Sequence, residues 1–146
     1  MSLSKDLVGK EFPSFYYEVS REKIKEFLRA LNETKEVYWD KEKAKEAGFS
    51  DTPAPPTFST AILFHGNPNF FSDIASIGVD IKRLLHMKEE YTYHKPIYPG
   101  MTVHCQSQVI DVKTGKMDML TTKGTMHDQD GNLCMEMEMA IVIRPE

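Results

Sequence analysis

The chain is poor in cysteine and has no long apolar run. Its only two cysteines, Cys105 and Cys134, are too few for a disulfide framework, and both lie in strand-like sequence as small buried residues. No apolar stretch approaches the roughly 20 residues that span a bilayer, and residues 1–10 lack the apolar core of a signal peptide. We therefore expect a cytoplasmic protein with no membrane partner.

Basic residues are not in excess, because the net charge is -4 and lysines are interleaved with glutamates. This pattern is typical of solvated helix faces, and it argues against a nucleic-acid partner. The five histidines have no metal-ligand spacing with one another or with cysteine, and no glycine-rich phosphate loop or Gly-x-Ser-x-Gly motif is present. No metal and no cofactor are expected.

The composition fits a single domain over residues 1–146, with 40% hydrophobic and 27% charged residues. An aromatic strand is predicted over Ser14–Val19. Ser20 is a candidate N-cap for a helix with one apolar stripe, made of Ile24, Phe27, Leu28 and Leu31. A second helix is predicted to begin at Asp40 and to end at Gly48.

A third helix is predicted over Thr57–His65. Three prolines between Pro53 and Pro56 force an extended path before it, and Gly66 and Pro68 end it. Because the segment is apolar on nearly every side, we expect it to be buried all round. A further helical piece is expected around Phe70–Ile77.

The remaining chain is predicted to form a meander of four antiparallel strands. Leu85, Met87, Tyr91 and Tyr93 alternate on one face of the first, and Glu89 is an exception to that apolar face. The next two strands are expected over Val103–Val112 and Met117–Met126. In the last, one face is apolar from Leu133 to Ile143, whereas Cys134, Glu136 and Glu138 lie on the other. The order of elements predicts an α+β fold in which a sheet covers the buried helix.

Four stretches of the chain share an order with a known family: Val8–Phe27, Tyr38–Asp40 with Ala44–Phe49, Ala54–Phe58 and Tyr91–Gly100. Together they resemble the N-terminal domain of MaoC-like dehydratases. The resemblance implies the hot-dog fold, an antiparallel sheet wrapped around a central helix. It is nearest to the A-type subunits of two-subunit (3R)-hydroxyacyl-carrier-protein dehydratases. It also implies an acyl-CoA or acyl-carrier-protein thioester as ligand, and a homodimer or a heterodimer with a second hot-dog subunit.

Active members of this family carry an Asp-x-Asn-Pro-x-His run, whose Asp and His transfer the protons of dehydration. Here Glu33 stands in the Asp position, Tyr38 in the His position, and Lys35-Glu36 replaces Asn-Pro. Tyrosine has an ordinary pKa of about 10, so it is a poor proton shuttle at neutral pH. The sequence leaves two alternatives open, a non-standard acid–base pair, or a loop carboxylate beside a packed aromatic ring.

The resemblance also suggests residues that bind the substrate. Pro56, Thr57 and Phe58 lie where the family's oxyanion-binding amides begin the central helix, and Phe64 lies farther along it. His94 belongs to the Tyr-His-Lys-Pro run near the family's substrate tunnel. Trp39 is either a substrate platform or a packing residue. The nine methionines could line an acyl tunnel or fill a plain core.

Three functions remain open on the sequence alone. The first is an acyl-binding subunit with a degenerate motif that needs a catalytic partner. The second is a self-sufficient hydratase or thioesterase that uses non-standard residues. The third is a binding or assembly module without thioester chemistry.

Overall fold

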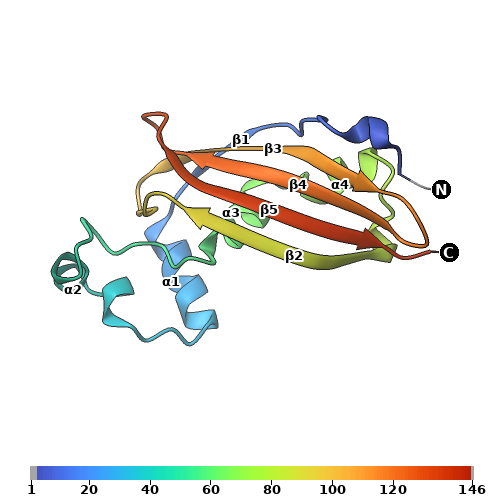
Figure 1. The fold of residues 1–146 in the computed structure, drawn as a ribbon. Helices are drawn as coiled ribbons and strands as arrows, with labels where there is room; N and C mark the ends of the chain where they lie inside the picture. The colour runs from blue at the N-terminus through green and yellow to red at the C-terminus, as the bar shows by residue number, and fades with distance from the viewer. Residues whose placement is uncertain (1–2, 146) are drawn as a thin grey trace.

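Five antiparallel strands form one sheet in the order β1-β3-β4-β5-β2 (Figure 1). The computed structural model describes residues 3–145. The strands are β1 (Phe15–Glu18), β2 (Leu84–Tyr93), β3 (Thr102–Lys113), β4 (Asp118–His127) and β5 (Leu133–Ile143). Strands β1 and β2 are therefore the two edges of the sheet.

The helices divide into two groups. Helices α3 (Phe58–Gly66) and α4 (Phe70–Ser76) lie behind one face of the sheet, and α1 (Arg21–Ala30) and α2 (Lys41–Glu46) lie beyond one end of it (Figure 1). Three short 3₁₀ turns complete the fold, at Lys5–Leu7, Glu36–Tyr38 and Ile81–Arg83. The expected α+β architecture is confirmed.

Local signals in the sequence set the ends of the first helices as predicted. The Ser20 side chain accepts a hydrogen bond from the Lys23 amide at 3.4 Å and caps α1. The Asp40 side chain accepts from the amides of the second and third residues of α2 at 2.8 and 3.0 Å. Gly48 has φ +92°, which lets the chain turn away directly after α2.

Helix α3 separates the core into two apolar clusters. Phe58 and Ile62 are buried with Leu28 of α1 and Val103 of β3, whereas Leu63 packs with residues nearer α4. The prediction of burial all round is wrong for the outer side of α3, because Phe64 remains 43% exposed and His65 is also exposed. The single sheet covers only one side of the helix.

Strand β2 departs from the prediction in two ways. It pairs with β5 at the far edge, so only β3, β4 and β5 form a meander. The pairing with β5 also shifts by one residue between His86 and Lys88. This bulge reverses which side chains face the helices, since one extra residue inverts the alternation of a strand.

The bulge changes the assignment of faces. Glu89, Tyr91 and Tyr93 share the inner face with the buried β5 methionines, and Leu85 and Lys88 lie on the opposite face. The prediction that Leu85 shares a face with Tyr91 is therefore wrong, and Met87 lies at the bulge itself, 55% exposed.

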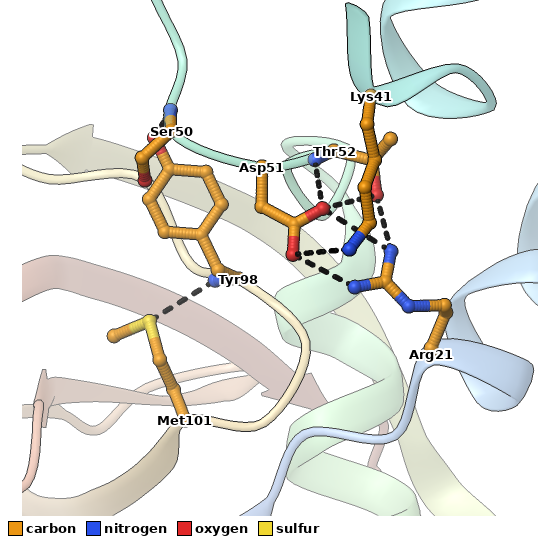
Figure 2. Close-up of polar contacts among 7 residues, drawn as sticks. All are labelled: Arg21, Lys41, Ser50, Asp51, Thr52, Tyr98 and Met101. Atoms are coloured by element: carbon orange, nitrogen blue, oxygen red, sulfur yellow. Dashed lines mark hydrogen bonds and ion pairs between the residues drawn. The ribbon is translucent and has the colours of Figure 1, made fainter. Parts of the chain in front are cut away.

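A cluster of charges fixes the extended segment before α3 (Figure 2). The Arg21 guanidinium donates to both carboxylate oxygens of Asp51, at 2.7 and 3.3 Å, and to the Thr52 hydroxyl at 2.8 Å. Lys41 Nζ lies 3.7 Å from the same carboxylate. Because α1 and α2 both bond to Asp51, they hold the start of the proline segment against the rest of the fold.

This cluster predicts an acid-sensitive stability. Hydrogen bonds from Arg21 lower the pKa of Asp51 from 3.8 to about 2. A carboxyl group with a lowered pKa stabilises the folded state above its unfolded pKa and loses that contribution as the pH falls toward its folded pKa. We expect Asp51→Asn to lower the free energy of unfolding by about 1 kcal/mol at pH 7. Thermal unfolding from pH 7 to pH 2 should then show a smaller loss of stability below pH 4 in the variant than in the wild type.

Asp130→Asn, on the exposed β4–β5 turn, is the matched control and should leave the pH profile unchanged. Equal profiles for wild type and Asp51→Asn would contradict the role of the cluster.

A second prediction concerns the end of α3, where the chain approaches β1 closely. A Cβ at Gly66 would lie 2.8 Å from Tyr17 and 2.9 Å from Phe15, closer than side-chain carbons normally pack. Gly66→Ala should therefore lower the free energy of unfolding by about 1–3 kcal/mol. Gly115→Ala is the control, since its nearest atom lies at 3.9 Å. Denaturant unfolding measures both; equal midpoints for the two variants would refute the close approach.

Candidate functional site

Two cavities lie on either side of α3. The first, which we call the helix-start cavity, has a volume of about 330 Å³. Its walls are the proline segment Pro53–Pro56, the first turns of α3, and the loop that follows β2. Four of the predicted site residues line it together: Tyr38, Pro56, Phe58 and His94.

The second, which we call the sheet cavity, has a volume of about 210 Å³ and lies between α3, α4 and the inner face of the sheet. Phe64 is the predicted site residue that lines it. Phe64 also packs edge-on against Phe70 at 4.8 Å between ring centroids. Its lining is largely apolar, with Met137, Met139 and Ile141 of β5 as the floor and Leu84, His86 and Glu89 at the β2 side.

Glu33 and Tyr38 do not line a common cavity in the structure. The Glu33 carboxylate accepts a hydrogen bond from the Lys35 amide at 2.9 Å, so it folds back on its own loop, and Glu33 lines neither cavity. Tyr38 is half-buried and lines the helix-start cavity. The carboxylate is therefore not turned toward the cavity that the Tyr38 ring helps to form.

Trp39 stabilises the same loop. Its indole Nε1 donates to the Glu33 carbonyl at 2.9 Å, and the Arg29 guanidinium lies 5.8 Å from the centroid of its ring. These contacts hold the loop to the end of α1, and Trp39 lines neither cavity. Its role in binding a substrate stays a prediction.

The start of α3 offers fewer amides than expected. Pro56 has no N–H, and the Phe58 amide donates to the Pro55 carbonyl at 2.9 Å. The Thr60 amide donates to the Thr57 carbonyl at 3.1 Å, and the exposed Thr57 side chain does not cap the helix. This leaves the amides of Thr57 and Ser59 as candidates for binding an oxyanion, and of these two residues Ser59 lines the helix-start cavity whereas Thr57 does not.

His94 is hydrogen-bonded to a carboxylate at the rim of the helix-start cavity. Its Nε2 lies 2.8 Å from Glu136 Oε2, and Lys123 Nζ lies 2.9 Å from the other oxygen of that carboxylate. Hydrogen bonds from Lys123 and His94 lower the pKa of Glu136. The contact ties the loop after β2 to β5.

Sequence reasoning missed a polar network on the inner face of β2. The Tyr91 hydroxyl donates to the Glu89 carboxylate, and Thr60 Oγ1 of α3 lies 3.2 Å from the same hydroxyl. Burial is the main cause that raises the pKa of Tyr91. The sequence contained a hint of this network, because Glu89 interrupts an otherwise apolar face.

The described part of the chain offers little for other chemistries. Within residues 3–145, no group of three or more His, Cys, Asp or Glu side chains could hold a metal ion. Burial raises the pKa of the Cys105 thiol to about 12, so this cysteine is a packing residue and a poor nucleophile. No helix in the same range is long and apolar enough to cross a membrane.

Comparison with known proteins gives consistent matches over most of the chain. A family model described as the FAS1-like dehydratase domain region matches residues 6–137. The UPF0336 protein SCO4636 of Streptomyces coelicolor is 36% identical over 134 residues, which cover 90% of this chain and 88% of that protein.

Solved structures with a similar fold include a MaoC-like dehydratase and a dehydratase complex. A MaoC-like dehydratase aligns with a TM-score of 0.80 and 25% identity over 96% of this chain and 43% of that chain. The HadBC (3R-hydroxyacyl-ACP dehydratase) complex from Mycobacterium tuberculosis aligns with a TM-score of 0.76 and 24% identity, covering 90% of this chain and 92% of that chain. The predicted hot-dog fold is thereby confirmed, and structural neighbours of this chain include MaoC-like dehydratases. The chain belongs to the FAS1-like dehydratase region family.

Proposed function

We propose that this chain is the acyl-binding subunit of a two-subunit (3R)-hydroxyacyl-thioester dehydratase, and that the partner supplies the proton-transfer pair. The observation that carries the proposal is the position of Glu33, whose carboxylate is bonded to its own loop, away from the cavity that Tyr38 lines. A proton-transfer residue must reach the reacting atoms within hydrogen-bond distance or through one water. The solved HadBC complex, which combines two different subunits of this fold, supports a heterodimer.

The positions of the two cavities along β2 support a site shared by two subunits, in which one binds the acyl chain and the other transfers the protons. Leu84 at the start of β2 lines the sheet cavity, and Tyr93 at its end lines the helix-start cavity. The family resemblance implies that two hot-dog units meet edge to edge. If two β2 strands pair antiparallel about a two-fold axis, the end of each strand meets the start of the other.

Such pairing would bring the helix-start cavity of one subunit beside the sheet cavity of the other. A partner with an intact Asp/His pair would then hold the reacting carbons of the thioester. The acyl chain would extend into the sheet cavity of this chain, whose methionine floor adapts readily to a flexible apolar ligand.

The first test mixes the purified chain with crotonyl-CoA and follows loss of the enoyl thioester. We expect no hydration above the rate in buffer for the chain alone, and hydration after addition of a hot-dog subunit with an intact Asp-x-Asn-Pro-x-His run. Turnover by the chain alone that is lost in Tyr38→Phe would overturn the proposal and assign catalysis to Glu33 and Tyr38. Release of free thiol by the chain alone would instead indicate a thioesterase.

A second test asks which cavity holds the acyl chain. Thr122 lines the floor of the sheet cavity, so Thr122→Phe should narrow it and weaken binding of long-chain acyl-CoA by about tenfold, with little effect on a four-carbon acyl group. Ala54→Leu, which narrows the helix-start cavity, is the matched control. Calorimetric titration of the two-subunit complex measures both. If only Ala54→Leu weakened binding, the acyl chain would lie in the helix-start cavity, and its assignment to the sheet cavity would be wrong.

A further inference from the structure

Strand β2 presents a long free edge. Its ten residues pair with β5 on one side, and within residues 3–145 no other strand pairs with it. Three of its apolar side chains are exposed by about half: Leu85 at 47%, Met87 at 55% and Tyr93 at 51%. An exposed edge strand with apolar side chains is a template for pairing with a second chain.

One charge on this strand faces inward. The β5 register sets Glu89 opposite Met139, which is buried, so the Glu89 carboxylate points to the side of the sheet that α3 covers. It is partly buried, accepts the Tyr91 hydroxyl and lines the sheet cavity. A second subunit that covered the edge would remove more water from this carboxylate, which is costly unless an opposite charge or a donor meets it.

Symmetry limits how two copies of the chain could pair through β2. In an antiparallel pair, residues directly opposite each other point to the same face of the sheet. A two-fold axis perpendicular to the sheet therefore has to run between one residue of β2 and the same residue of the second copy. The middle of Leu84–Tyr93 falls between Lys88 and Glu89, so these two residues define the registers with fullest overlap.

Both registers bring like charges together. One register sets Glu89 opposite Glu89 on the inner face; it also sets Lys88 opposite Glu90 on the solvent-exposed face, where an ion pair contributes little. The other sets Lys88 opposite Lys88 and keeps the two Glu89 carboxylates within about one residue of the axis. Like charges directly opposite each other destabilise a strand pair. Lys88 is partly neutralised, because its Nζ lies 3.0 Å from Glu90 and 3.3 Å from Glu138 at the wet face. On the inner face the Tyr91 hydroxyl donates to the Glu89 carboxylate, and within residues 3–145 no cation forms a comparable ion pair with it.

We propose that Glu89 determines the choice of partner: it disfavours a second copy of this chain and selects a hot-dog subunit whose edge strand presents a basic side chain or a neutral hydrogen-bond donor at the facing position. The inference rests on the proposed function only in its assumption that subunits pair through β2. Repulsion against the wrong partner together with attraction to the right one is a common basis of specificity.

The test compares self-association of the full chain and of two variants by sedimentation velocity, without substrate or partner. Glu89→Gln keeps the shape and an acceptor for Tyr91 but removes the inward charge. We expect it to tighten the dimer dissociation constant by at least about tenfold. Glu18→Gln removes the same charge from an exposed position on the other edge strand, β1, and should leave the constant within about twofold. A wild-type dimer as tight as that of Glu89→Gln would overturn the proposal.

Cysteine cross-linking identifies the edge that is used. In the Glu89→Gln background, Lys88→Cys should form a disulfide-linked dimer under mild oxidation, because the axis passes beside it. Tyr16→Cys, at an exposed position on the opposite edge strand β1, should stay monomeric. Cross-linking through Tyr16→Cys alone would reject pairing through β2. Neither experiment requires turnover, so a failure of Glu89 selectivity is distinguishable from a failure of the proposed dehydratase role.

Discussion

Phe58 and Ile62 of α3 are almost fully buried against the inner face of the sheet, and the rest of the structure depends on that packing. Burial of side chains of this size is worth about 1.5–3 kcal/mol each. It holds the helix across the sheet, and the helix then forms a wall of both cavities. The proline segment before α3 and the charges around Asp51 serve the same purpose, since they fix where the helix begins (Figure 2).

Much of the fold could be predicted because its determinants are local. Ser20 and Asp40 cap the helices to which the sequence assigned them, and the apolar segment at Thr57–His65 forms α3 one residue later along the chain. The place of β2 could not be predicted in this way. Whether a strand pairs with its neighbour in sequence or with the last strand depends on contacts between residues far apart in the chain. The bulge before Lys88 could not be predicted either, because no characteristic residue type marks it in the sequence.

The candidate site was predicted in part. The family resemblance named Tyr38, Phe58 and His94 as site residues from three separate stretches of the chain, and all three line one cavity. The resemblance assigned Glu33 to the site from its position in the motif alone. The direction of its carboxylate is set by a hydrogen bond from the Lys35 amide, which the spacing of residues in the motif does not predict. Phe64 lies in the other cavity, and Glu89 emerged only when the bulge fixed the face of β2.

The shared wall has a mechanical consequence. Since α3 separates the helix-start cavity from the sheet cavity, a rigid shift of the helix that widens one of them narrows the other. A ligand that displaced α3 from one cavity would therefore reduce the space in the other. Such a displacement would be smallest at Gly66, where the end of α3 lies closest to Tyr17 and Phe15 of β1.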